Sequence, residues 1–299
     1  MKAEEQKVST GEAEGASLWQ DAWRRLKRNR LAVIGGIIVA LVVFLALFGA
    51  WFVTKYNGFT YETQDLTQKL ASPTRLHPLG TDMLGRDLLV RLLYGSRISL
   101  LVGLVSTLVS VVIGVSYGAI AGYFGGRIDE LMMRVVDILY SLPYVIMVVV
   151  LLAVFERSLL LLFIALGAIS WLTLARIVRG QVLSLKNEQF VEAARATGVS
   201  NLAIIFRHIV PNTLGPVIVY ATLTIPTVIL EEAFLSFLGL GVQPPMPSWG
   251  VLASEGAQAI SVHPLVLIAP ATLMAITLFS LNFLGDGLRD ALDPQTRKI

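Results

Sequence analysis

The sequence predicts an all-α membrane protein with six transmembrane helices. Its mean hydropathy is +0.70 and only 15% of its 299 residues are charged, values outside the usual range for a soluble domain. Apolar runs long enough to cross a hydrocarbon core of about 30 Å define the expected helices within residues 31–284. These runs are Leu31–Val53, Ile98–Gly122, Leu131–Phe155, Leu159–Ile177, Leu214–Leu238 and Pro264–Leu284.

The segment before the first run has two parts. Residues 1–16 are rich in Glu, Lys, Ser and Gly, which predicts a disordered cytoplasmic tail. Residues 17–30 predict an amphipathic interfacial helix, because Trp19, Trp23 and Leu26 recur at helical spacing among arginines and lysines. Such a helix places its tryptophans in the headgroup region and its cations toward anionic membrane lipid. The first run is too long for a signal peptide, so we expect it to remain as an anchor.

The runs themselves contain small residues and prolines. A stripe of small residues in the second run favours close packing of another helix within one bundle over a dedicated dimer motif. The stripe consists of Ser106, Ser110, Gly114, Gly118 and Gly122. Prolines inside three of the runs are expected to kink the helices or to mark where they part. They are Pro143, Pro226 and Pro270.

The distribution of Lys and Arg predicts that both termini are cytoplasmic. The basic residues gather in the N-terminal arm, the segment Arg179–Arg207 and the tail 285–299, whereas Gly239–Val262 contains none. The loop Thr54–Arg97 is placed outside despite its basic residues, because a loop of that length has little weight in the rule. Within it, Thr81 or Asp82 is expected to cap a short helix leading into the second run. The Gly- and Pro-rich stretch "GLGVQPPMPSWG" suggests a loop or partial re-entry.

Residues 187–212, between the fourth and fifth runs, are too polar for a seventh span. Each charged side chain there would cost about 2.5–3.5 kcal/mol at the bilayer centre. The pattern predicts a helical hairpin in which Asn187 and Ser200 begin the two helices and Gly198 and Pro211 end them. The second helix is expected to have one apolar face, formed by Leu202, Ile205, Phe206 and Ile209. This hairpin is either a docking surface or a solvated link between two spans.

Charged residues inside the spans are candidates for function. Glu231 and Glu232 lie in the outer half of the fifth run, where they would line a pathway or form an outer gate with an arginine such as Arg86 or Arg97. Adjacent residues on a helix point about 100° apart, so at most one glutamate faces the pathway squarely. The alternative is a purely structural pairing. In the third run, Arg134 and Asp137 are expected to pair with each other.

The motif content argues against chemistry in this chain. It has no cysteine, no phosphate-binding G-x-x-x-x-G-K-[ST] loop and no H-E-x-x-H, and its three histidines are scattered, so we expect no catalytic or metal site. The net charge of +3 is explained by cytoplasmic loops and does not imply nucleic acid. A secondary transporter or channel should contain an inverted repeat or mid-membrane ion ligands, and an intramembrane enzyme a nucleophile with a base; neither pattern is visible.

The residues of the predicted hairpin resemble a known family. Glu192, Ala193 and Ala194, followed by Gly198 and Pro211, are similar to the EAA loop of permease subunits in ATP-binding-cassette importers, although His208 and Val210 depart from its usual pattern. Residues from about Ser17 to Pro294 resemble the peptide-importer branch, particularly the C-type subunit of oligopeptide permeases. The stretches that carry this resemblance are "HPLGTDMLGRDLLVRLLYGSRISL", "AGYFGGRIDELMMRVVDI", "SFLGLGVQPPMPSWG" and "GDGLRDALDP".

The resemblance implies a type I importer permease fold in the bacterial cytoplasmic (inner) membrane. It implies that loop 187–212 couples the spans to two ATPase subunits, which carry ATP and magnesium, so that this chain needs no cofactor. It further implies a second permease subunit, which completes a pathway for oligopeptides, and a periplasmic substrate-binding protein. In such a pathway, whichever of Glu231 and Glu232 faces the cargo would attract the amino terminus of a peptide or hold the outer gate. Peptide length, side-chain preference and the possibility of another small solute as cargo remain open, because the related branch also carries such solutes.

Overall fold

The computed structural model describes residues 18–155 and 158–292, and these form a bundle of helices. Their isolated β-bridge joins Thr81 to Asp87. Residues 1–16, predicted as a disordered tail, lie outside the described part of the chain. The α-helices are α1 (Leu18–Arg28), α2 (Arg30–Phe44), α3 (Ala50–Asn57), α4 (Leu88–Phe124), α5 (Gly126–Ser141), α6 (Tyr144–Val154), α7 (Leu159–Leu185), α8 (Gln189–Ala196), α9 (Asn201–Ala203), α10 (Leu214–Phe237), α11 (Trp249–Ala259) and α12 (Leu265–Leu292). Shorter turns are η1 (Leu45–Gly49), η2 (Leu66–Gln68), η3 (Ile204–Ile209) and η4 (Val210–Thr213).

The six expected spans correspond to five long apolar helices and one bent pair. The long helices are Arg30–Asn57, Leu88–Phe124, Leu159–Leu185, Asn201–Phe237 and Leu265–Leu292. The bent pair is α5 and α6, which meet at 88°. Pro143 lies at the break and Leu142 before it is extended, since a proline disfavours helical geometry in the residue that precedes it. Pro226 and Pro270, in contrast, lie inside the continuous helices α10 and α12.

The small-residue stripe of α4 packs directly on α7. A Cβ atom on Gly114 or Gly122 would lie 2.9 Å from a backbone carbonyl oxygen of α7, that of Trp171 or Arg179. At Gly118 it would overlap the carbonyl oxygen of Ala175. The two backbones therefore approach as closely as the absent side chains allow, which is how membrane helices gain packing energy without a hydrophobic drive. The prediction of a packing seam within one bundle is confirmed.

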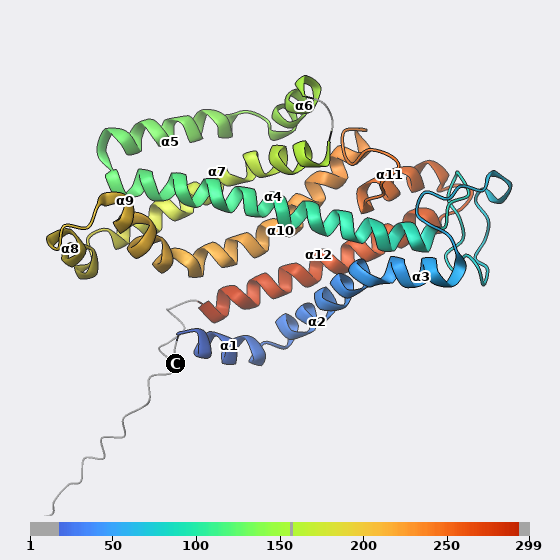
Figure 1. Cartoon of the computed structure of the whole chain (residues 1–299), viewed down its shortest axis with the longest axis horizontal. Helices are drawn as coiled ribbons and strands as arrows, with labels where there is room; N and C mark the ends of the chain where they lie inside the picture. Colours follow the sequence, from blue (N-terminus) through green and yellow to red (C-terminus); the bar gives the residue numbers. More distant parts are fainter. Residues whose placement is uncertain (1–17, 156–157, 293–299) are drawn as a thin grey trace, which may run out of the picture.

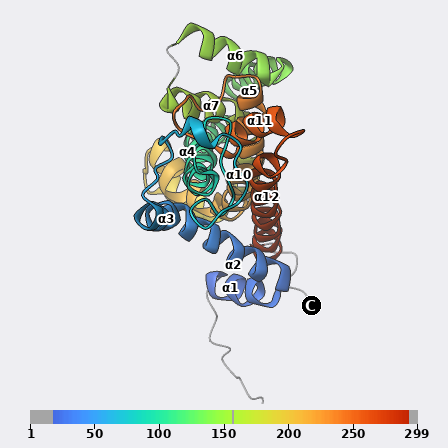
Figure 2. The same ribbon diagram turned by 90° about the vertical axis from the view of Figure 1, so that its right-hand side faces the viewer.

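The bundle has two distinct ends. In Figure 1, α8 and α9 lie at one end of the long axis, and α3, α11 and the segment 58–87 lie at the other. Helix α1 and the last turns of α12 lie in the half that holds α8 and α9, where Ala22 and Leu26 pack against Ala32 and Ala291. Figure 2 shows α5 and α6 along one flank of the bundle and α1 and α2 along the opposite flank.

Helix α1 has one face on the protein and one face exposed. Leu26 is buried, but Trp23 is 57% exposed and has Lys27 Nζ 5.0 Å from the centre of its ring. The predicted apolar face of Trp23 and Leu26 is therefore divided between the outside and the bundle. The side chain of Trp19 lies outside the described part of the chain.

The cap of α4 differs from the prediction. Asp87, and not Thr81 or Asp82, is the N-cap residue, and its Oδ1 accepts a hydrogen bond from the Val90 amide at 2.8 Å. His77 Nδ1 lies 2.8 Å from the other oxygen of Asp87 and ties the preceding loop to the cap. Asp82 instead stabilises the loop, where it accepts from the amides of Leu84 and Arg86.

Candidate functional site

The first half of the hairpin ends in a left-handed turn at Gly198. Gly198 has a φ of +79°, its amide donates to Arg195 O at 3.0 Å, and the Val199 amide donates to Ala194 O at 3.1 Å. This is the Schellman pattern, which satisfies the last carbonyls of a helix and favours glycine at the left-handed position. The predicted helix end at Gly198 is confirmed. The predicted start is wrong by one residue, because Glu188 and not Asn187 is the N-cap of α8.

The second half of the hairpin continues into the membrane. Ser200 occupies the N-cap position of α9 without a side-chain cap bond, and α9 leads through the π-helical turn η3 and the 3-10 turn η4 into α10. The prediction that Pro211 ends this helix is wrong. Pro211 lies in the first positions of η4, and the helical segment continues past it from Asn201 to Phe237. The hairpin and α10 therefore form one connected helical segment.

The inner side of the hairpin is packed against α4 and α7. Its buried apolar side chains are Val191, Ala194, Ile204, Ile205 and Ile209, and they form one cluster with Leu174, Val178 and Val182 of α7. A polar contact adds to this packing, since Tyr123 OH of α4 donates to Asn201 Oδ1 of the hairpin at 2.8 Å. The hairpin is thus fastened to the ends of two long helices.

The outer side of the hairpin exposes apolar and charged side chains together. Leu202 is 60% exposed, Phe206 is 44% exposed and Phe190 is 38% exposed. The predicted single apolar face is therefore wrong in detail, because Ile205 and Ile209 point inward while Leu202 and Phe206 point outward. Among the residues singled out from the sequence, Ala194 is buried, whereas Glu192, Ala193 and Pro211 are exposed.

The two glutamates of α10 have different surroundings. Glu231 is half-buried and lines a cavity of about 530 Å³ between the bent pair α5 and α6 and the helices α7 and α10. Glu232 is fully buried, and its Oε1 accepts hydrogen bonds from Ser236 Oγ and Ser248 Oγ, each at 2.7 Å. Only one of the pair therefore faces open space, as the 100° between adjacent helical residues predicts.

The gate expected between these glutamates and Arg86 does not form. Arg86 pairs with Asp82 and Glu255, while Arg97 is exposed on α4. Glu232 is instead part of a structural network, because Ser248 is the N-cap of α11 and its Oγ also accepts from the Val251 amide at 3.1 Å. Glu232 is thus part of a buried hydrogen-bond network and Glu231 lies on a cavity wall, while a role of either glutamate in a pathway stays a prediction.

Comparison with known proteins assigns the family. Residues 114–298 match the model of the binding-protein-dependent transport system inner membrane component, and residues 17–73 match the N-terminal transmembrane domain of oligopeptide transport permease C. The oligopeptide transport system permease protein OppC of Haemophilus influenzae is 53% identical over 293 residues, which cover 97% of this chain and 93% of that protein.

The chain belongs to the binding-protein-dependent transport permease family. This permease is also 50% identical to the OppC protein of Escherichia coli over 96% of its length and 94% of that protein. It is 45% identical to the dipeptide transport system permease protein DppC of Bacillus subtilis over 94% and 87%. The resemblance to the oligopeptide permease branch is confirmed, and the chain is a multi-pass permease subunit of the inner membrane.

A solved structure supports the fold. The methionine ABC transporter MetNI, in an inward-facing form, has a chain that aligns with a TM-score of 0.54 at 22% identity, over 69% of this permease and 96% of that chain. At that identity the likeness concerns the fold alone. The permease therefore has the all-α architecture of an ABC importer permease.

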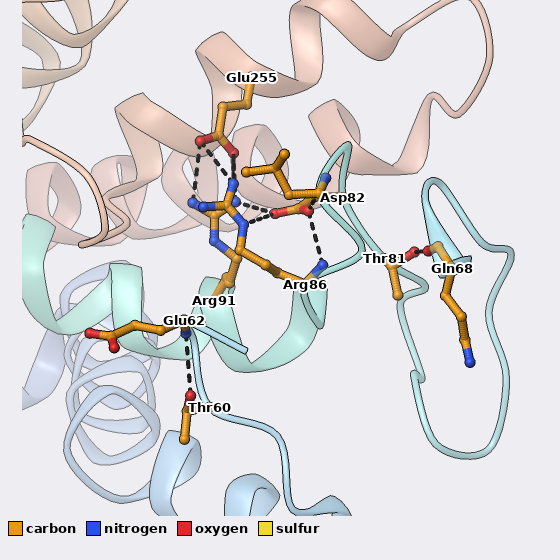
Figure 3. Close-up of polar contacts among 9 residues, drawn as sticks. Thr60, Glu62, Gln68, Thr81, Asp82, Arg86, Arg91 and Glu255 are labelled. Atoms are coloured by element: carbon orange, nitrogen blue, oxygen red, sulfur yellow. Dashed lines mark hydrogen bonds and ion pairs between the residues drawn. The ribbon is translucent and has the colours of Figure 1, made fainter. Parts of the chain in front are cut away.

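The sequence did not reveal a buried charge cluster at the end opposite the hairpin. Figure 3 shows the guanidinium groups of Arg86 and Arg91 side by side, directed at Asp82 and Glu255. Arg86 Nε donates to Asp82 at 2.6 Å, and Arg91 Nη1 donates to Glu255 Oε2 at 2.5 Å and to Asp82. The cluster joins the loop 58–87 and α4 to α11. Its only signal in the sequence was the density of arginine in a loop expected to lie outside.

Ion pairs between α5 and α7 also differ from the prediction. Arg134 pairs with Glu130 at 3.0 Å and Asp137 pairs with Arg176 at 2.7 Å, so Arg134 and Asp137 are not partners. A charged side chain can pair either one turn away on its own helix or with a neighbouring helix. Arg134 pairs within α5, whereas Asp137 pairs with a residue of α7. Within residues 18–155 and 158–292, no group of three or more His, Cys, Asp or Glu side chains is arranged to hold a metal ion.

Proposed function

We propose that this permease forms half of a translocation pathway for oligopeptides and that hairpin 187–212 couples the pathway to partner ATPase subunits. The observation that carries the proposal is the two-sided hairpin. Its inner side is locked to α7 by Val191, Ile204 and Ile205, while Leu202 and Phe206 remain exposed on its outer side. Exposed apolar side chains on a polar, rigid element are typical of a surface that a protein partner covers.

Continuity between the hairpin and α10 gives the coupling a physical route. A rigid-body movement of the hairpin would displace α10, which carries Glu231 on the cavity wall. ATP binding would draw two ATPase subunits together, and the hairpins would follow and open the cavity outward; hydrolysis would restore the inward state. ATP and magnesium would be held by those subunits, with a second permease subunit beside this one and a binding protein outside. The hairpin and both termini would then be cytoplasmic.

Substitution of Gly198 tests the coupling. Gly198→Val forces a branched side chain into left-handed geometry, which costs about 1–2 kcal/mol locally, whereas Gly198→Asn keeps a residue that tolerates this geometry. A Cβ atom at Gly198 would have no neighbour within 4 Å among the described residues, so strain and not overlap is the cause. We expect the valine variant to insert its spans normally but to lose co-purification of the ATPase subunits or peptide-stimulated ATP hydrolysis. If both variants match the wild type in these assays and in uptake, the hairpin is only a link between spans.

The cargo is tested by uptake into proteoliposomes that contain the whole importer. Labelled di-, tri- and pentapeptides should accumulate in the presence of ATP, with the longer peptides favoured if this complex resembles its oligopeptide relatives more than the dipeptide ones. Accumulation of a non-peptide solute in place of all three would contradict the proposed substrate class.

A further inference from the structure

The cavity beside Glu231 is built mainly from hydroxyl-bearing and apolar side chains. Among the described residues that line it, Glu231 is the only charged one. The hydroxyl groups come from three elements that are distant in the sequence: the α5–α6 bend, α7 and α10. They belong to Tyr140, Tyr144, Ser170, Thr173, Tyr220, Thr224 and Thr227.

Several of these hydroxyl groups are arranged as hydrogen-bond acceptors. Ser170 Oγ donates to Leu166 O at 3.0 Å, and Thr224 Oγ1 donates to Tyr220 O at 2.9 Å. Thr227 Oγ1 donates to Leu223 O at 3.3 Å. Each hydroxyl has a single hydrogen, which is already used within its own helix, so its lone pairs are what remains for a ligand. These three hydroxyls and the Glu231 carboxylate therefore offer acceptors to a ligand that carries N–H donors and positive charge.

The length of the wall fits an extended chain. Tyr220 and Glu231 mark the two ends of the lining on α10, and the rise of 1.5 Å per residue separates them by about 16 Å. An extended peptide covers about 3.3–3.6 Å per residue, so about four or five residues fit along this wall. Glu231 lies at the end nearer α11 and Tyr220 at the end nearer the hairpin.

We propose that Glu231 binds the amino-terminal ammonium group of the transported peptide, with the following residues extended along α10 toward Tyr220. This inference rests on the proposed function and specifies how the pathway holds its cargo. The carboxylate and the ammonium form a charge-assisted hydrogen bond. The hydroxyl groups of Ser170, Thr224 and Thr227 accept hydrogen bonds from the peptide's backbone N–H groups, which are the same whatever the side chains. Glu232 has no such role, because its Oε1 is occupied by two serine hydroxyls in the protein interior.

The test compares a tetrapeptide that has a free amino terminus with its N-acetylated form, in proteoliposomes containing the complete importer and its binding protein. Glu231→Gln should lower uptake of the free peptide about tenfold or more, the size expected for loss of a charge-assisted hydrogen bond. Uptake of the acetylated peptide should not change. Glu130→Gln, which removes an exposed carboxylate from α5, is the matched control and should leave both peptides unaffected.

The outcomes separate this inference from the proposed function. If the wild type imports neither peptide, the proposed function fails. If the wild type imports the free peptide but Glu231→Gln imports it equally well, or lowers both peptides by the same factor, the role of Glu231 is wrong.

A second measurement uses the wild-type complex and so does not depend on the folding of a variant. A photoreactive phenylalanine at the second position of the tetrapeptide should label α10 near Thr227, and one at the last position, about 10 Å from the amino terminus, should label it near Thr224. The reverse order, or labelling confined to other helices, would overturn the inference.

Discussion

Ser248 Oγ donates a hydrogen bond to Glu232 Oε1 at 2.7 Å and thereby joins the N-terminus of α11 to the C-terminal third of the membrane-embedded α10. Ser236 Oγ donates to the same oxygen, and all three side chains are buried. The buried carboxylate therefore anchors the short helix α11, whose first residue, Trp249, also donates its amide hydrogen to Ser99 Oγ at 2.9 Å.

Replacing this carboxylate should destabilise the protein more than replacing its neighbour. Glu232→Ala leaves two buried hydroxyls without their acceptor, and each such group costs about 1–3 kcal/mol. Glu231→Ala removes a half-buried side chain from a cavity wall and leaves that network intact. Thermal unfolding of the detergent-solubilised permease should therefore occur at a clearly lower temperature for Glu232→Ala. Equal losses in the two variants would contradict the division of roles between the glutamates.

The seam between α4 and α7 predicts a contrast between two glycines. A methyl group on Gly118 meets the carbonyl oxygen of Ala175, which belongs to the backbone and cannot rotate away. Gly180, on α7, has no neighbour within 4 Å of an added Cβ among the described residues, so alanine there should be neutral or favourable by up to about 1 kcal/mol. Gly118→Ala should reduce the yield of monodisperse protein in size-exclusion chromatography, while Gly180→Ala should not. A tolerated Gly118→Ala would mean that the two helices separate easily.

The outer charge cluster predicts a contrast between two arginines of α4. Arg91→Leu leaves Asp82 and Glu255 short of a partner, and breaking a buried ion pair costs about 3–5 kcal/mol. Arg97→Leu removes an exposed charge from the same helix and should change stability little. Protease sensitivity of the loop 58–87 in purified protein reports the difference, because the charge cluster joins Asp82 and Arg86 of this loop to Glu255 of α11. Similar digestion of both variants would show that the cluster does not hold the loop.

The proposed orientation can be measured with single cysteines in this cysteine-free chain. Asn187, Gln64 and Asp290 are exposed, and Gln243 is half-buried. In intact cells, an impermeant maleimide should label cysteines at positions 64 and 243 and spare those at 187 and 290, which become reactive only after permeabilisation. Labelling of position 187 but not position 243 in intact cells would reverse the topology.

Much of the fold could be predicted because its causes are local. Hydropathy alone located the spans, Pro143 marked the break between α5 and α6, and Gly198 marked a turn that requires a positive φ. The face of the second hairpin helix could not be predicted, because the packing on α4 and α7 buries Ile204, Ile205 and Ile209 together and leaves Leu202 exposed. Ile205 therefore points inward and Phe206 outward.

The site was predictable only where it depends on one helix. Adjacent glutamates must diverge on α10, so the different surroundings of Glu231 and Glu232 followed from helical geometry. The partner of Arg91 could not be predicted, since Glu255 lies 164 residues further along the chain and only the packing of α11 on α4 brings them together. The contacts Arg134–Glu130 and Asp137–Arg176 were missed for a related reason. The sequence does not tell whether a charged side chain will pair within its own helix or with a residue of another helix.

The most direct test of the coupling hairpin is photo-cross-linking from Phe206 in the assembled importer. A photoreactive benzoylphenylalanine at this exposed position should form a covalent adduct with an ATPase subunit, and the same group at Phe52, which is exposed on α3 at the opposite end of the bundle, should not. The yield at Phe206 should change when ATP is bound, because the hairpin moves with the ATPase subunits. If Phe206 gives no ATPase adduct in a complex that still hydrolyses ATP and imports peptide, the hairpin does not dock on the ATPase and the account is wrong.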